Sequence, residues 1–211
     1  MNGHTHEFEP DFGFPESLPI SEKVLWQGSP NAWLIAKRVF LLPHLIFYFL
    51  IISFFSSSFQ INILTTEALI LNFLSNLLLG LVAILILLAI SYLISATTVY
   101  SITDKRLVMR IGIVLNLSLN IPFSKIQLAE TKSYVDKSGD ISIELMPSSK
   151  IAYLHLWPHC RPWFFSAPRP RLCCLENIEK VAQIFKRSWK EQREMLECNN
   201  EAITNKSTGK G

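Results

Sequence analysis

The segment between Arg38 and Lys105 contains no lysine and no arginine, although the chain of 211 residues has 20 of them. Two long apolar runs lie within this segment, Val39–Phe59 and Phe73–Ile94. Each run has about the 20 residues that a helix needs to cross the roughly 30 Å hydrocarbon core of a membrane. The missing positive charge and the two runs together predict an integral membrane protein with a helical hairpin.

Basic residues flank the two runs and predict the orientation of the hairpin. They stand just before the first run and just after the second: Lys37, Arg38, Lys105, Arg106 and Arg110. The connecting segment Gln60–Asn72 carries a single charged residue, Glu67. Because short cytoplasmic segments are enriched in Lys and Arg, we expect a multi-pass membrane protein. Both of its termini would be cytoplasmic and the short connection would lie outside.

Signals of several other protein classes are missing. The polar, acidic N-terminus and the late start of the first apolar run exclude a secretory signal peptide. The chain has no glycine-rich phosphate loop, no HExxH motif and no visible nucleophile–base arrangement. We therefore expect a protein that is not an enzyme and has no nucleic-acid partner. All four cysteines fall on the predicted cytoplasmic side, where free thiols are the rule: Cys160, Cys173, Cys174 and Cys198.

After Ser95 the apolar residues alternate with polar ones, and turn residues separate the alternating stretches. Period-two alternation is typical of half-buried strands. It predicts strands near residues 97–103, 106–111, 113–120, 126–136, 140–146 and 151–156. The short connections indicate antiparallel pairing. An amphipathic helix, Leu175 to about Glu197, follows a proline-rich aromatic segment. Strands followed by one closing helix predict a small antiparallel β-barrel that is capped by a C-terminal helix.

The fold class is therefore a membrane α+β protein, a two-helix transmembrane hairpin joined to a small barrel domain. A short strand candidate, Val24–Gly28, precedes the hairpin. The expected parts are an acidic N-terminal arm (residues 1–22), a short strand with an interfacial helix (23–38), the hairpin (39–95), the cytoplasmic domain with its C-terminal helix (96–197) and a disordered tail (198–211). The stretch Arg161–Arg193 is rich in cations. Such a stretch is either a solvated helix face or a surface attracted to anionic lipid.

The segment Thr98–Gly112, TVYSITDKRLVMRIG, resembles the bacterial pleckstrin-homology-like domain family. Members of this family often carry a transmembrane hairpin before this strand–turn–strand segment and close a barrel with a C-terminal helix. The local chemistry agrees, because Thr103-Asp104-Lys105 is suited to a tight turn.

Two further segments are similar to the PuhB family of photosynthetic complex assembly proteins of purple bacteria. They are Leu25–Pro30, LWQGSP, and Ile151–Trp163, IAYLHLWPHCRPW. The resemblance runs from about Glu22 to Phe185. It implies a non-enzymatic factor of the bacterial inner (intracytoplasmic) membrane that helps to assemble the photosynthetic reaction centre and the core light-harvesting complex. The implied partners are reaction-centre membrane subunits, the light-harvesting 1 complex and a second copy of the chain. No intrinsic cofactor is implied, and contact with bacteriochlorophyll would come through partner subunits.

The segment that follows the predicted strands contains the best candidates for partner binding. Trp and Arg are residue types that are enriched at binding hot spots, and loops carry function more often than cores do. The candidates are His155, Trp157, His159, Arg161 and Trp163. The alternative is that the two tryptophans seal the barrel end and that Arg161 is a surface cation.

Two weaker hypotheses concern metal and pigment ligands. His155, His159 and the neighbouring cysteines include soft ligands for zinc, but their spacing matches no standard site. We therefore predict no metal site. His44, near the cytoplasmic start of the first span, could ligate a chlorin magnesium through its imidazole, or it could simply meet water at the interface.

The alternative function is a generic membrane-tethered pleckstrin-like module that binds lipid or scaffolds another envelope complex. Most of the hairpin-and-barrel pattern suits it equally well. The segment Ile151–Trp163 favours the assembly factor.

Overall fold

The computed structural model describes residues 18–19, 22–59, 65–112, 117–146, 158–160 and 169–208, with side chains described as far as Cys198. Two compact units are present. One unit is Asn31–Ala96, and the other combines the chain up to Pro30 with the chain from Thr97 onward. The N-terminal segment therefore belongs to the same unit as the residues that follow the second apolar helix.

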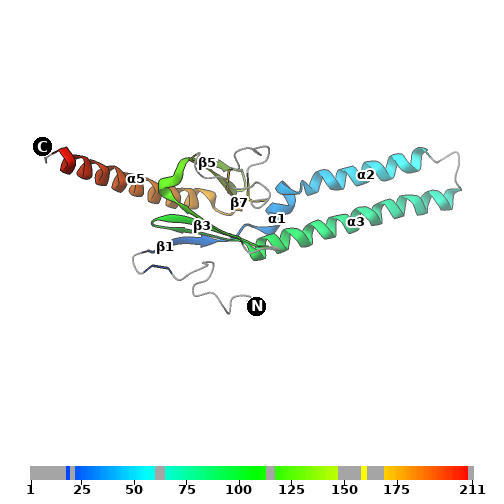
Figure 1. Cartoon of the computed structure of the whole chain (residues 1–211). Coiled ribbons are helices and arrows are strands. Elements are labelled where there is room, and N and C mark those ends of the chain that lie inside the picture. The colour runs from blue at the N-terminus through cyan, green and yellow to red at the C-terminus, as the bar shows by residue number, and fades with distance from the viewer. Residues whose placement is uncertain are drawn as a thin grey trace. The chain divides into compact units, whose positions relative to one another are not determined.

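The first unit is a hairpin of the helices α2 (Leu42–Phe59) and α3 (Thr66–Thr97), shown in Figure 1. Both helices are long and apolar enough to cross a membrane. Gly80 of α3 lies against the ring of Phe49, because a Cβ atom at residue 80 would come within 2.8 Å of that ring. Towards the other end of the pair, the Ser56 hydroxyl donates to Asn72 Oδ1 (3.1 Å). Small and polar residues thus join the two apolar helices, as is common in lipid.

The helix bounds differ from the predicted spans of 39–59 and 73–94. Helix α3 begins at Thr66 because Glu67 in its first turn is favourable near the positive end of the helix dipole. Before α2, the chain forms the short helix α1 (Ala32–Leu34) and the π-helical turn η1 (Ile35–Val39). The Asn31 side chain caps α1 by accepting the Leu34 N–H (3.1 Å). These turns occupy the place of the predicted interfacial helix.

The second unit contains two antiparallel sheets. The first sheet has the order β1-β2-β3-β4, and the second has the order β5-β6-β7. Their bounds are β1 (Val24–Gly28), β2 (Val99–Thr103), β3 (Arg106–Ile111), β4 (Leu117–Pro122), β5 (Ile126–Ser133), β6 (Gly139–Leu145) and β7 (Arg171–Leu175). Strand β1 pairs with β2, so the segment before the hairpin completes the sheet that follows it.

The predicted closed barrel is wrong for the described strands, because no pairing joins the two sheets. Strand β4 ends at Pro122, which has no backbone N–H for a ladder. The 3₁₀ turn η2 (Phe123–Lys125) then redirects the chain into β5. Of the predicted strands, 151–156 lies outside the described residues. Strand β7 was not predicted.

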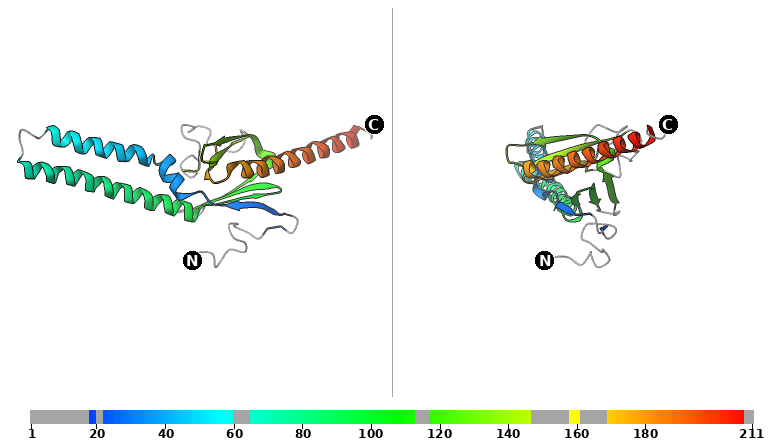
Figure 2. Two further views of the ribbon diagram at one scale, coloured as in Figure 1. Left: turned by 180° about the vertical axis from the view of Figure 1, so that it is seen from behind. Right: turned by 90° about the vertical axis from the view of Figure 1, so that its left-hand side faces the viewer.

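Helix α5 (Ile178–Thr208) covers the space between the two sheets and continues past them, as Figures 1 and 2 show. Its buried face, Ile178, Val181, Ala182 and Phe185, packs into a core built from both sheets. Phe185 meets Phe123 edge to face, with ring centroids 5.6 Å apart. The predicted helix end at Glu197 and the predicted disordered tail are wrong as far as Thr208. The chain has no glycine or proline in this stretch until Gly209.

Candidate functional site

One of the predicted partner-binding residues, His159, lies among the described residues, and it is completely buried. His155, Trp157, Arg161 and Trp163 lie outside them, so their assignment to partner binding stays a prediction. His44 is described and exposed in the first turn of α2. Its role as a pigment ligand stays a prediction as well.

His159 is held by three side chains of the second unit. Its Nδ1 lies 2.5 Å from the Tyr100 hydroxyl and 3.3 Å from Cys173 Sγ. Its Nε2 lies 3.2 Å from the Thr98 hydroxyl. The Tyr100 and His159 rings meet edge to face, with centroids 5.7 Å apart. Both imidazole nitrogens therefore have polar partners, which removes the cost of burying the ring.

The fold brings these residues together from distant parts of the chain. Thr98 directly precedes β2 and Tyr100 is the second residue of that strand, so their side chains, two residues apart in extended chain, point to the same side. The loop that carries His159 is tied to β7, because the Arg171 N–H donates to the His159 carbonyl (2.8 Å) and Cys160 forms a bridge with Pro170. The buried cluster thus joins the residue directly after α3 to the last strand of the second sheet.

The adjacent thiols of Cys173 and Cys174 have opposite electrostatic environments, although both are buried. A hydrogen bond from the Cys174 side chain, together with the nearby His159 imidazole and Arg171 guanidinium, holds the pKa of the Cys173 thiol well below its usual value despite burial. The same hydrogen bond and burial raise the pKa of Cys174 far above its usual value. Burial and the proximity of Cys173 raise the pKa of the Tyr100 hydroxyl. Cys173 is therefore the more acidic thiol of the pair.

Asp140 of β6 connects this cluster to the surface. One carboxylate oxygen accepts the Cys174 N–H (2.8 Å), and the other lies 3.5 Å from Arg171 Nη1 and 3.4 Å from the Tyr134 hydroxyl. Cys174 has a φ of 55°, a left-handed conformation that turns its N–H towards this carboxylate. The Asp140 carboxylate thus stabilises the unusual backbone of the cysteine pair.

The cluster is closed to solvent. No group of three or more His, Cys, Asp or Glu side chains within the described part of the chain is arranged to hold a metal ion. All four cysteines are free thiols, in agreement with the prediction. The sequence analysis missed the role of the cysteine pair. The adjacent cysteines after the Pro-Arg-Pro run were the available signal, but their histidine partner is fourteen residues away in sequence.

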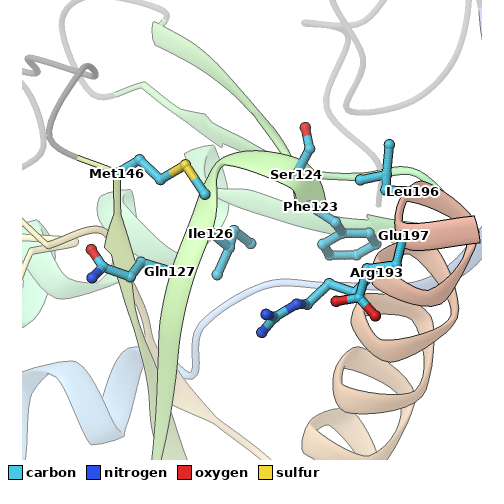
Figure 3. A pocket seen from close by; sticks show the side chains of 8 residues that line it. All are labelled: Phe123, Ser124, Ile126, Gln127, Met146, Arg193, Leu196 and Glu197. Carbon is cyan, nitrogen blue, oxygen red and sulfur yellow. The ribbon is translucent and has the colours of Figure 1, made fainter. Parts of the chain in front are cut away.

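An open cavity of about 210 Å³ lies elsewhere on this unit, between η2, the start of β5 and the distal part of α5 (Figure 3). Phe123 and Ile126 form its buried floor. Met146, Leu196 and the Arg193 guanidinium stand around it. We refer to this cavity as the α5 groove. It is lined by apolar side chains with polar groups of Ser124, Gln127 and Glu197 at its margin.

The comparison with protein families agrees with this architecture of an apolar hairpin followed by two antiparallel sheets and a helix. The family model described as the bacterial PH domain matches residues 39–189, more than half of the chain. The chain belongs to the bacterial PH domain family. The matched region of this bacterial PH domain protein includes the hairpin as well as the sheets and the first part of α5.

A relative from Rhodobacter capsulatus is similar over most of its length. It is described as an uncharacterized 23.7 kDa protein in the puhA 5′ region. The two chains are 29% identical over 192 residues, which cover 88% of this bacterial PH domain protein and 87% of the relative. No solved structure matches the chain.

Proposed function

We propose that this protein is a non-enzymatic membrane assembly factor for the photosynthetic reaction centre and its core light-harvesting complex. It would act by binding newly made membrane subunits. The observation that carries the proposal is the similarity, over most of both chains, to a protein described by its place in the puhA 5′ region. The resemblance of the segment Ile151–Trp163 to the PuhB family supports the same function.

The hairpin supports a role within the membrane. Its helices present large apolar side chains outward, with Phe47 65% exposed on α2 and Leu78 62% exposed on α3. Such surfaces are compatible with lipid and with the helices of other membrane subunits. The basic residues at Lys37, Arg38, Lys105 and Arg106 favour an orientation in which both termini and the PH domain are cytoplasmic.

Binding alone can account for an effect on assembly. A factor that binds unassembled subunits in their folded form lowers the population that aggregates or is degraded, and the yield of complex rises by mass action. Loss of the protein should therefore lower the amount of assembled complex without shifting its absorption spectrum.

The test is an affinity capture of the tagged protein from mildly solubilised photosynthetic membranes. Mass spectrometry and near-infrared absorption would identify the bound material. We expect reaction-centre subunits in the eluate and a loss of them when Trp157 and Arg161 are replaced by alanine. A deletion strain that keeps full reaction-centre levels would refute the proposal. An eluate that holds lipid and the protein itself would instead favour a generic membrane-tethered module.

A further inference from the structure

The outer edge of β5 is a long, exposed strand edge. Strand β5 is the first strand of the order β5-β6-β7, and no described strand pairs with its outer side. Six of its eight residues are exposed. A bulge is confined to its beginning, between Ile126 and Leu128, and the register is regular from Ala129 to Ser133. Unpaired edges of this kind are templates for strand addition, and proteins usually shorten, charge or cover them.

The pairing of β6 shows which backbone groups of β5 face outward. Ala129 lies opposite Ile143 in the ladder, and the Ile143 N–H points the other way and donates to the Pro170 carbonyl (2.8 Å). The pair of Ala129 and Ile143 is therefore a non-hydrogen-bonded pair, and the N–H and C=O of Ala129 face away from β6. Since this alternation has a period of two, Thr131 and Ser133 also direct their backbone groups outward.

Helix α5 runs alongside β5 in the opposite direction. At its start, the Ile178 N–H donates to the Lys137 carbonyl (3.0 Å), just beyond the end of β5. Farther along α5, Arg193 and Leu196 line the α5 groove together with Ile126 and Gln127 at the start of β5. Figure 3 shows the strand and the helix on opposite sides of this groove. The open edge and the groove therefore belong to one continuous surface.

The composition of this surface indicates the chemistry of its ligand. Among the described residues of this unit, apart from Val24, Leu25 and Val135, the exposed large apolar side chains lie on β5, at the end of β6 or on distal α5: Leu128, Met146, Met195 and Leu196. Exposed methionine is typical of adaptable binding surfaces. The Arg193 guanidinium lies 5.7 Å from the Trp189 ring centroid. It lines the groove together with the Glu197 side chain, so the margin of the groove carries one charge of each sign.

We infer that the β5 edge and the α5 groove form a docking site for an extended peptide of a partner subunit. The peptide would add to the sheet as a fourth strand beside β5 and place an apolar side chain in the groove. A row of alternating backbone donors and acceptors is matched by another polypeptide backbone and not by lipid chains. The inference deepens the proposed function and rests on it for the source of the peptide.

The test places a photoreactive benzoylphenylalanine at Gln127, at the margin of the groove, in the full-length protein in photosynthetic membranes. The control position is Arg187, which is 68% exposed on α5 and not part of the groove. We expect a cross-link from position 127, but not from position 187, to a soluble segment of a reaction-centre or light-harvesting subunit. Mass spectrometry would map the linked residue.

A matched pair of substitutions tests the strand addition itself. Thr131→Pro removes an outward N–H, whereas Thr131→Val keeps it, and an edge strand tolerates proline at such a position. Loss of a backbone hydrogen bond and of close strand contact should lower the cross-link yield about tenfold or more for Thr131→Pro, with little change for Thr131→Val. Leu196→Asp, which leaves β5 unaltered, should lower the yield as well. Intrinsic tryptophan fluorescence would verify that each variant is folded.

The outcomes separate this inference from the proposed function. A cross-link unaffected by Thr131→Pro, a cross-link to lipid only, or no cross-link at all would overturn the docking site. Reaction-centre levels in the same strains report on the assembly role independently. A proline-sensitive cross-link to an unrelated protein, with normal reaction-centre levels, would keep the docking site and refute the assembly function.

Discussion

Removal of the Tyr100 hydroxyl tests the buried cluster most directly. Tyr100→Phe keeps the ring and its edge-to-face contact with His159. It removes the oxygen that lies 2.5 Å from His159 Nδ1, 3.4 Å from Cys173 Sγ and 3.4 Å from the Cys173 backbone nitrogen. The remaining groups stay buried, because Tyr100, His159 and Cys173 are each 0% exposed.

The expected cost follows from the groups that lose their partner. A net hydrogen bond contributes about 0.5–1.5 kcal/mol, and a buried polar group left without a partner costs about 1–3 kcal/mol. The imidazole keeps its contact with Cys173, and the 3.4 Å contacts are long, so the short bond to His159 accounts for most of the loss. We therefore expect Tyr100→Phe to lower the free energy of unfolding by about 2–3 kcal/mol.

Chemical denaturation of the purified full-length protein in detergent, followed by tryptophan fluorescence, measures this change. Tyr134→Phe is the matched control. Its hydroxyl is only half-buried and lies 3.4 Å from Asp140, so it should cost less than about 1 kcal/mol. A loss below about 0.5 kcal/mol for Tyr100→Phe, in the range of ordinary surface substitutions, would refute the assignment of the cluster as a stabilising network.

Three further predictions concern pH, the hairpin and the core. Because the folded protein lowers the pKa of Cys173, the free energy of unfolding should rise with pH up to the ordinary thiol value of 9.0, and Cys173→Ser should flatten that slope in denaturation series at several pH values. Gly80→Ile should force α3 away from Phe49, which distance measurements between labels on α2 and α3 would detect as a wider separation. Phe185→Ala should cost about 3–5 kcal/mol by denaturation, and an unchanged midpoint would contradict its place in the core.

Local patterns predicted the elements whose residues interact with near neighbours. Strands β1 and β3 occur at the predicted residues, because short alternating runs bounded by turn residues favour strands wherever they pack. The end of α5 was wrong because polarity indicated a disordered tail, whereas continued helix formation requires only residues without strong breakers. The two separate sheets were missed because alternation identifies strands such as 113–120 and 126–136 but does not specify which strands pair with one another.

The sequence by itself determined the apolar hairpin, the antiparallel strands and the free thiols. Length, hydropathy and period-two alternation are properties of contiguous residues, so they can be read without the fold. Only the tertiary structure decided that His159 is a buried partner of Tyr100 and Cys173, and that the β5 edge lies beside the α5 groove. These arrangements join residues from 14 to more than 60 positions apart, for example His159 with Cys173 and Thr98 with His159. Their contacts depend on the pairing of strands, which no local pattern specifies.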